Sequence, residues 1–511
     1  MTDADVIVIG SGPAGVSAAW PLAEAGRRVL MIDGAAERSP DIATPWRQML
    51  GDRLEALQPD DGLSPKLRTP EARQVTGDFN RWSVLETDEF LPLGAMARGG
   101  LSRIWGAFVS EFDDNDLLGW PVSAKDLAPS YRAIAARIGI SGSADDDMAA
   151  SYGSTGELLA PPPISPTATL LLERYRATKP DKDFSLGHAR NALLTADRGD
   201  RKACDLRQAC LWACPRGAIY DARQDVALLR RQPNFELLDG AIANGITRVD
   251  DGWEIALATS ERRLRAPKLV IAAGALGSLR LVAPLLDLTR APLRLLNSPV
   301  MALPLLVPKR LGSAPPTQGY SLAQLGFRLA VSSLPSDYVT GGIYETAALP
   351  PSSFAARLPL GRRAATQVVR ALAPALLVAT VYFPGGYSAN TISVQTSADG
   401  PRIRIHGGVA ERFHGVARVV QGRLKKIWRA LGAYALPVGE LATAGTDAHY
   451  GGIFPMGGTQ PHGTSRFGEL NAAPGLHVVD GSVLSTIPAK FTTLTIMANA
   501  DRIGRHLAGA A

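Results

Sequence analysis

The sequence predicts an α/β protein whose centre is a β-α-β unit with parallel strands. The apolar run from Val6 to Ile9 is typical of a buried strand and leads into a glycine-rich turn. A helix is expected from about Pro13 to Ala25, and the run from Arg28 to Ile32 forms a second strand that ends at Asp33. Together these segments make a complete β-α-β unit.

A later segment repeats the pattern of a buried strand followed by a glycine turn. The run from Lys268 to Ala273 is apolar after its first residue and leads into Gly274. Residues 291–440 are less regular and rich in proline, which indicates a separate domain. The other expected elements are the strands 235–238, 246–249 and 253–257 and the helices 124–138, 415–431 and 495–507.

Length and composition indicate a globular protein of two or three domains. The chain has 511 residues, of which 46% are hydrophobic and 20% charged. Its formal charge of +6 is not gathered into a lysine- and arginine-rich run or an aromatic-interleaved basic patch. We therefore expect no nucleic-acid partner.

The sequence leaves the compartment open. The N-terminus has no basic region followed by an apolar stretch and a cleavage site, so no signal peptide is visible. An apolar run at 371–383 is too short to span a bilayer and contains Pro374. Arg357, Arg362, Arg363 and Arg370 precede it, so peripheral contact with a membrane stays open beside a solvated helix face.

The glycine spacing of the first turn is that of a dinucleotide cradle. Gly10, Gly12 and Gly15 allow the chain to turn tightly and to approach a pyrophosphate, which rests on the helix N-terminus. Asp33 stands at the strand end, where it can accept hydrogen bonds from an adenosine ribose, and its charge disfavours the 2′-phosphate of NADP. At this point FAD and NAD both remain open.

Several further segments resemble the glucose–methanol–choline (GMC) oxidoreductases. The stretch Gly99 to Trp105 matches a GGxSxxW motif of that family, and Trp120 to Tyr131 resembles the segment that follows it. The runs 272–278 and 449–502 resemble the second signature and the C-terminal block. The matches follow the family order, whereas 291–440 contains no motif that we recognise.

The resemblance implies non-covalent FAD in a discontinuous Rossmann-like domain with α+β insertions. The FAD-binding domain would comprise 1–115, 205–290 and 441–511, and the substrate domain, built on an antiparallel sheet, would comprise 116–204 and 291–440. Ile104 stands where covalent members carry a histidine, which excludes a covalent link at that position. The expected FAD-binding residues are Gly10, Gly12, Gly15, Asp33, Gly99, Gly100, Ser102, Trp105, Gly274, Asp480 and Gly481.

The same resemblance implies that His449 is the catalytic base. Family members use a histidine of an HxxG motif to take the hydroxyl proton while hydride passes to flavin N5, and His449 matches it. His462 is a second choice. The usual polar partner is missing, because Phe491 occupies its place. Lys490 is adjacent, and either polarises an alkoxide or is simply a surface charge.

All three cysteines of the chain, Cys204, Cys210 and Cys214, lie in one short segment. Clustered cysteines followed by proline are typical of iron–sulfur proteins. The spacing resembles that of the catalytic subunits of bacterial FAD-dependent glucose and fructose dehydrogenases, which implies a [3Fe–4S] cluster. Inert thiols and a zinc site are the alternatives, although zinc would lack a fourth ligand.

These expectations combine into an FAD-dependent dehydrogenase that oxidises a CH–OH group of a sugar, polyol or glycoside. Electrons would pass through the cluster to a cytochrome or a small partner subunit, which could also export the chain. One alternative is an oxygen-using oxidase or tailoring enzyme for a bulky hydrophobic alcohol. Another is a flavin-bound subunit with little catalytic activity. The substrate itself cannot be read from the sequence.

Overall fold

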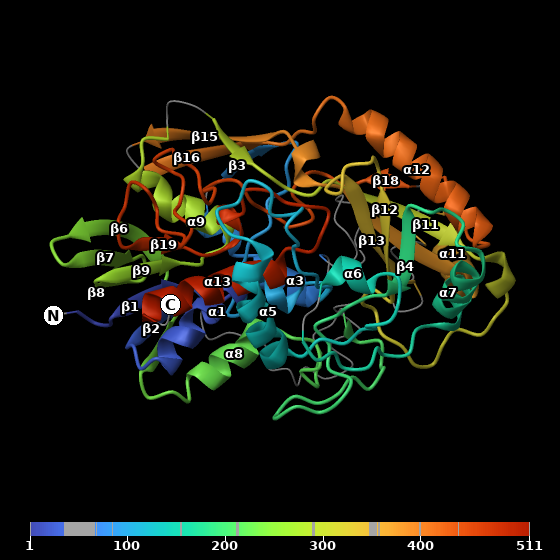
Figure 1. Cartoon of the computed structure of the whole chain (residues 1–511), viewed down its shortest axis with the longest axis horizontal. Coiled ribbons are helices and arrows are strands. Elements are labelled where there is room, and N and C mark those ends of the chain that lie inside the picture. Colours follow the sequence, from blue (N-terminus) through green and yellow to red (C-terminus); the bar gives the residue numbers. More distant parts are fainter. Residues whose placement is uncertain are drawn as a thin grey trace.

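The computed structural model describes residues 2–34, 67, 69–83, 85–153, 156–210, 214–288, 292–346, 355, 358–397, 400–437 and 439–509. Figure 1 shows two parts along the long axis of the molecule. The part on the left contains the strands β1, β2 and β9 and both chain ends, and the part on the right contains a larger antiparallel sheet.

A five-stranded parallel sheet forms the centre of the first part. Its strands lie in the order β19-β9-β1-β2-β5, and every neighbouring pair is parallel. The sheet thus joins strands from the beginning, middle and end of the chain, which confirms the expected discontinuous Rossmann-like domain. Its bounds are β1 Val6–Ile9, β2 Val29–Asp33, β5 Phe235–Asp239, β9 Lys268–Ile271 and β19 Leu476–Val478.

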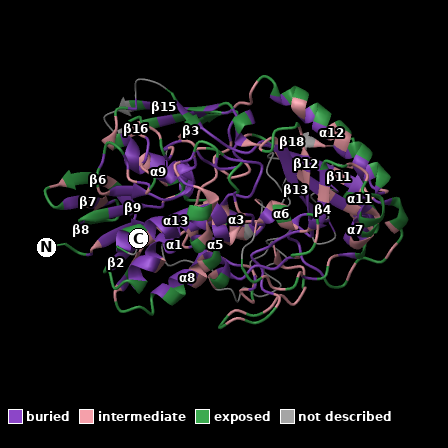
Figure 2. Ribbon diagram, viewed as in Figure 1, coloured by how far each residue is buried: buried purple, intermediate pink, exposed green. Residues whose placement is uncertain are grey.

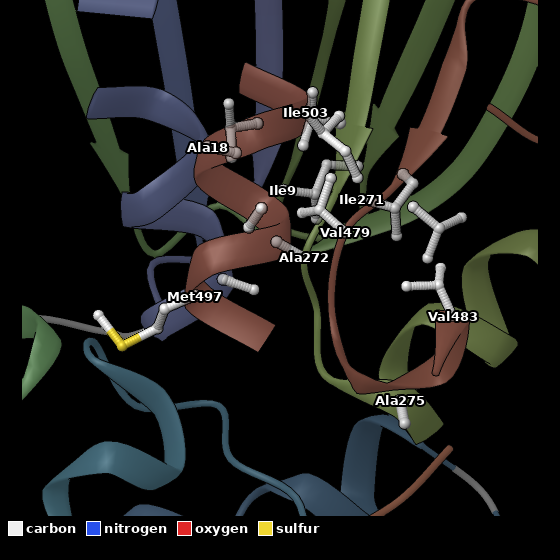
Figure 3. Close-up of a cluster of buried hydrophobic side chains, with 14 of the residues drawn as sticks. Ile9, Ala18, Ile271, Ala272, Ala275, Val479, Val483, Met497 and Ile503 are labelled. Atoms are coloured by element: carbon white, nitrogen blue, oxygen red, sulfur yellow. The ribbon is translucent and has the colours of Figure 1, made fainter. Parts of the chain in front are cut away.

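Helix α1 (Pro13–Glu24) and the antiparallel segment 243–266 both contact this sheet, and all four residues of β1 are buried. Helix α1 packs closely on α13 (Thr493–Ala508), where a Cβ on Gly504 would collide with the carbonyl oxygen of Ala18. Figure 3 shows Ile9, Ile271 and Ile503 in the apolar cluster that joins the sheet to α13. The first and last elements of the chain therefore share one core.

Further helices surround this core. Helix α5 (Ala124–Ile138) begins with a capping box at Ser123 and buries one face, including Tyr131, in the same core. The sequence assigns this helix to the substrate domain, yet it packs beside α13. The remaining helices of this part are α3 Pro70–Thr76, α4 Phe79–Trp82, α8 Ala222–Leu229 and α9 Ala275–Val282.

Two smaller sheets complete the first part. The strands β6 (Ala243–Val249), β7 (Gly252–Leu257) and β8 (Ser260–Ala266) form an antiparallel meander. A four-stranded sheet has the order β10-β15-β16-β3, so it combines residues 293–295 and 390–406 with an N-terminal strand. Its bounds are β3 Leu85–Asp88, β10 Leu293–Leu295, β15 Asn390–Ser397 and β16 Gly400–His406.

The second part is built on a seven-stranded antiparallel sheet, as the expected fold class requires. Its main path is β17-β11-β14-β13-β12-β4, and β18 pairs with β11. Because side chains alternate along a strand, successive residues of β11 and β14 point to opposite faces of the sheet. The bounds are β4 Phe184–His188, β11 Val300–Leu306, β12 Leu325–Ala330, β13 Tyr338–Glu345, β14 Leu376–Tyr382, β17 Tyr434–Ala435 and β18 Glu440–Leu441.

One face of this sheet is covered by α7 (Pro166–Thr178) and α12 (Phe413–Ala430). Phe184, Phe327 and Trp428 meet there edge to face or stacked, which fills the core with aromatic rings. Figure 2 shows the outer side of α12 exposed and the strands beneath it buried. The other face of the sheet is only half-buried, because it borders a cavity.

The helix α11 (Arg362–Leu372) lies at the outer end of the second part and buries only Ala365 and Val369. A search of the described helices for a segment both long and apolar enough to cross a bilayer finds none.

Candidate active site

A cavity of about 790 Å³ runs from the glycine turn after β1 to the half-buried face of the antiparallel sheet. At one end Gly10, Gly12 and Asp33 line it, and at the other end the lining comes from β11, β13 and β14. His449 lies on the wall between them. The topology thus brings both ends of the chain to one site.

The glycine turn has the geometry of a pyrophosphate cradle. Gly10 has φ +105°, and a Cβ on Gly10 or Gly15 would collide with the carbonyl oxygen of Ala272 or Gly10, respectively. A Cβ on Gly12 meets nothing, since this residue faces the cavity. No side chain caps the N-terminus of α1, and its first turn has no acid, so its N–H groups are available to an anion.

Asp33 is tied to the turn through Ser11, which the sequence analysis did not single out. The Ser11 amide donates to the Asp33 carboxylate at 3.0 Å, and its hydroxyl does the same. The Ser11 hydroxyl also accepts a hydrogen bond from the Gly99 amide at 2.9 Å. One small side chain therefore connects the acid, the first turn and the GGxSxxW segment.

The GGxSxxW segment lies against the cradle. Gly99 and Gly100 have φ +84° and +58°, and Gly100 approaches Gly12. The Ser102 hydroxyl donates to the Gly99 carbonyl at 2.6 Å, and the indole N–H of Trp105 donates to the Tyr220 carbonyl at 2.8 Å. Gly100, Ser102 and Trp105 line the cavity, whereas Gly15 and Gly99 shape its wall from behind.

The C-terminal block reaches the same cavity through Asp480. Its carboxylate accepts hydrogen bonds from the Ser278 hydroxyl, the Ser482 hydroxyl (2.6 Å) and the Ser482 amide (3.0 Å). Burial raises the pKa of Asp480 despite these donors. Gly274 and Gly481 line the cavity beside it. All expected FAD-binding residues thus line this cavity or support its wall, and the cradle fits a dinucleotide.

His449 is held in its neutral form. Its side chain is 16% exposed, and burial lowers its pKa to about 4. Its ring lies 5.5 Å from Tyr382 and 6.3 Å from Phe491, centroid to centroid. A neutral imidazole can accept a proton across the physiological range. The alternative, His462, does not line the cavity.

Phe491 and Lys490 have different surroundings although they are neighbours. Phe491 lines the cavity, stacks on Phe108 at 4.0 Å between centroids and forms an apolar wall beside His449. The Lys490 ammonium lies 2.6 Å from Asp116 and 3.0 Å from Asp113, and its side chain is 4% exposed. The structure places this charge in a buried ion pair rather than on the cavity wall.

Asp447, which the sequence analysis missed, also lines the cavity. Its side chain is 1% exposed, and its carboxylate is 3.8 Å from Nδ1 of His449. The only signal in the sequence was its position two residues before the histidine.

The three cysteines are free thiols, and Cys210 lines the cavity. Burial and then the neighbouring thiols raise the pKa of Cys210 to about 12, and burial also raises that of Cys204. Among the described residues, no group of three or more His, Cys, Asp or Glu side chains is arranged to hold a metal ion.

Comparison with known proteins identifies the fold. Residues 5–63 match the model of the FAD binding domain family. The solved structure of pyridoxine 4-oxidase from Mesorbium loti superposes with a TM-score of 0.66 over 99% of each chain, at 16% identity. The chain as a whole has the fold of that structure. The match to the FAD binding domain family supports FAD over NAD as the dinucleotide of the cradle.

Two curated proteins also resemble parts of the FAD-binding chain. Paromamine 6'-oxidase of Streptomyces fradiae is 29% identical over 293 residues, which is 54% of this chain and 49% of that protein. Thiamine thiazole synthase of Aeropyrum pernix is 69% identical over 29 residues, or 6% of this chain and 11% of that protein. The chain thus spans about half the length of the first relative and a short segment of the second.

Proposed function

We propose that this protein uses FAD to oxidise a CH–OH group of a small-molecule alcohol, with His449 as the base that removes the hydroxyl proton. One observation carries the proposal. The buried, neutral His449 lines the same cavity as the dinucleotide cradle.

The residues that would hold FAD are those of the cradle and its surroundings. Asp33 suits the ribose, the turn at Gly10 to Gly12 suits the pyrophosphate, and the segments around Gly100 and Asp480 suit the remainder. Ile104 offers no nucleophile, which supports non-covalent binding. When bound, FAD supplies the acceptor for the hydride of the alcohol.

His449 and its surroundings supply the acid–base part of the reaction. The imidazole accepts the hydroxyl proton, and this makes the C–H bond a better hydride donor. The rings of Phe108, Tyr382 and Phe491 exclude water from that part of the cavity. A developing charge there is poorly screened, so its interactions with nearby groups are strong.

We propose oxygen as the electron acceptor, in place of the cluster-linked dehydrogenase that the cysteine spacing predicted. Paromamine 6'-oxidase and pyridoxine 4-oxidase are both named oxidases. An oxidase produces hydrogen peroxide in proportion to alcohol consumed, whereas a dehydrogenase reduces an added dye and leaves oxygen unused. Oxygen consumption and peroxide formation, measured with and without the dye, distinguish the two.

The cavity wall favours an alcohol with an apolar or aromatic body over a polyol. The half-buried face of the antiparallel sheet presents Val300, Ala302, Pro304, Val378 and Tyr344 to the cavity. Thr380 and Tyr382 lie on the same face, so the wall is mostly hydrocarbon with a few hydroxyl groups, and it suits an apolar body better than a ring of hydroxyl groups. Anaerobic reduction of the flavin by a panel of arylalkyl alcohols and sugars tests this preference.

The role of His449 is tested by the variant His449→Gln. We expect the rate of anaerobic flavin reduction to fall by about 100-fold or more, while flavin content stays near one per chain. The control is His406→Gln, because His406 is 55% exposed on β16 and outside the cavity. Unchanged reduction in His449→Gln would refute the proposal.

A second candidate keeps the three cysteines as ligands of an iron–sulfur cluster. Leu206 and Gln208, between Cys204 and Cys210, have φ +57° and +58°, a strained conformation that is often associated with functional loops. The thiols would have to draw together to bind iron, given their present arrangement. Iron and sulfide analysis after anaerobic purification tests it, and iron-free protein with full flavin excludes the cluster. A cytochrome or small subunit as acceptor belongs to this candidate.

The predicted peripheral membrane contact rests on α11. This helix carries Arg362, Arg363 and Arg370, and its Val368 is 38% exposed. Co-sedimentation with vesicles of anionic lipid, compared with vesicles of neutral lipid, tests the contact. Loss of binding in the triple variant to glutamine would support it, and equal recovery with both vesicle types would exclude it.

A further inference from the structure

The missing polar partner of His449 draws attention to the residue two positions before it. We propose that Asp447 is the positioning residue of His449. Its carboxylate holds the proton of the neutral imidazole on Nδ1 and stabilises the imidazolium that forms when a substrate hydroxyl gives its proton to Nε2. This inference rests on the proposed function, because it takes His449 as the base.

The first support is the geometry of the pair. Nδ1 of His449 lies 3.8 Å from Oδ2 of Asp447, and the His449 amide donates to the same oxygen at 3.3 Å. Nδ1 is buried and has no hydrogen-bond partner. A buried, unpaired ring nitrogen is costly, so the closest carboxylate is its natural acceptor after a small rotation of the ring.

The second support is the backbone between the two residues. Ala448 has φ +57°, a left-handed conformation that is unfavourable for alanine. Strained residues of this kind persist where the surrounding structure holds them, and they are concentrated at active sites. Here the strained residue lies directly between Asp447 and His449.

The third support is the way the carboxylate is anchored. Asp447 accepts hydrogen bonds from the Asn297 side-chain amide and the Ser298 backbone amide, both at 2.9 Å. Asn390 donates in turn to the Asn297 side chain at 2.7 Å and to the Leu295 carbonyl at 3.1 Å. This buried chain of amides joins β10 to β15 and fixes the carboxylate beside the imidazole.

The opposite pKa shifts of Asp447 and His449 suit a histidine that accepts a proton. Burial raises the pKa of Asp447 to about 7 and lowers that of His449 to about 4. Neither charge is favourable alone, but a carboxylate and an imidazolium this close stabilise each other in a poorly screened site. The nearby titratable groups are Tyr344, Tyr382 and Tyr450, and burial raises the pKa of all three, so they remain neutral.

The proton and electron balance of the step follows from this arrangement. The O–H bond of the alcohol breaks, and its proton passes to Nε2 of His449. The carbinol carbon would give up its hydrogen as a hydride to FAD when it is bound, so the carbinol would become a carbonyl. The proton on Nδ1 stays directed toward Asp447, whose negative charge offsets the new positive charge of the ring. The logic is that of a histidine oriented by an acid.

The decisive variant is Asp447→Asn. Its amide keeps the acceptor for Asn297 but can donate to Nδ1, which favours the tautomer with the proton on Nε2 and blocks proton acceptance. We expect anaerobic flavin reduction by an alcohol to slow by roughly 10- to 100-fold, with kcat affected more than KM. Asp447→Glu should recover part of the rate. Asp88→Asn is the matched control, since Asp88 bonds His406 in an exposed pair at 3.0 Å.

A second measurement reads the tautomer without catalysis. In flavin-loaded protein labelled with nitrogen-15 histidine, the resonances of His449 are assigned by their loss in His449→Gln. We expect a protonated Nδ1 in the parent protein and a shift toward protonated Nε2 in Asp447→Asn, with no change in Asp88→Asn. Thermal melting and flavin content establish that each variant is folded.

The outcomes separate this inference from the proposed function. If His449→Gln stops flavin reduction while Asp447→Asn alters neither the rate nor the nitrogen shifts, Asp447 is only structural and the inference is wrong. If His449→Gln leaves reduction intact, the proposed function fails. If no alcohol reduces the flavin, the nitrogen shifts alone still decide whether Asp447 sets the tautomer of His449.

Discussion

The ammonium of Lys490 lies 2.6 Å from the carboxylate of Asp116, and the Asp116 side chain is fully buried. Asp113 accepts from the same ammonium at 3.0 Å, and the hydroxyl of Tyr338 donates to Asp116. This ion pair connects the segment before α13 to the loop before α5. Through Tyr338 it also reaches β13 of the seven-stranded antiparallel sheet. It holds the neighbouring Phe491 in place beside His449.

Replacing Lys490 therefore tests a structural role against a catalytic one. In Lys490→Met the buried Asp116 loses its partner, and we expect the free energy of unfolding to fall by about 3–5 kcal/mol. The double variant Lys490→Met with Asp116→Asn should recover part of this loss. Urea denaturation measures both. A Lys490→Met protein of unchanged stability that no longer reduces its flavin would assign the lysine to the chemistry instead.

Alanine substitutions at Gly12 and Gly15 are expected to have different effects. In Gly15→Ala the new methyl group collides with the Gly10 carbonyl, so α1 must shift away from the sheet and the melting temperature falls. In Gly12→Ala nothing in the protein obstructs the methyl group, which instead points into the cradle. We expect Gly12→Ala to fold normally but to purify with little FAD. The flavin-to-protein ratio and the melting temperature of each apoprotein provide the check.

The Asp447–His449 pair predicts an unusual pH dependence of stability. The raised pKa of Asp447, about 7, contributes stability that is complete below about pH 4 and is lost as the pH rises to 7. The lowered pKa of His449, about 4, contributes stability that is complete above about pH 6.5 and is lost as the pH falls to 4. Between pH 4 and 6.5 the two contributions change in opposite directions and cancel.

Single variants remove this cancellation. As the pH rises from 4.5 to 6, we expect the free energy of unfolding of Asp447→Asn to increase relative to that of the parent protein. That of His449→Gln should decrease over the same interval. Each change should be at most about 1.4 kcal/mol per pH unit. Urea denaturation at three pH values in that interval measures the slopes. If the free energy of unfolding changes equally with pH in all three proteins, Asp447 and His449 do not have the shifted pKa values that their burial implies.

FAD should be released by acid precipitation. Ile104 carries no nucleophile, and the Cys210 thiol on the cavity wall stays protonated because burial raises its pKa to about 12. We expect the yellow colour in the supernatant and a colourless pellet. A coloured pellet from the parent protein that becomes colourless in Cys210→Ser would reveal a link to that cysteine.

Local patterns were sufficient to predict the Rossmann-like half of the fold. The glycine turn, the strand that ends at Asp33 and the strand before Gly274 all depend on neighbouring residues, which a sequence displays directly. The helices at 415–431 and 495–507 were also predicted, and they are observed at Phe413–Ala430 and Thr493–Ala508. The position of α5 beside α13 was not predicted, because packing partners are not encoded in the period of one helix.

The sequence by itself determined the FAD-binding fold and indicated His449, because glycine spacing and strand patterns reflect local backbone requirements. Only the tertiary structure decided which groups surround that histidine. Lys490, adjacent to the place of the missing partner, is held by Asp113 and Asp116, and Phe491 supplies an apolar wall. Asp447 lies beside the imidazole because a strained Ala448 and the donors Asn297 and Ser298 place it there. Such contacts join residues about 150 positions apart in the sequence, a relationship that only the packed chain establishes.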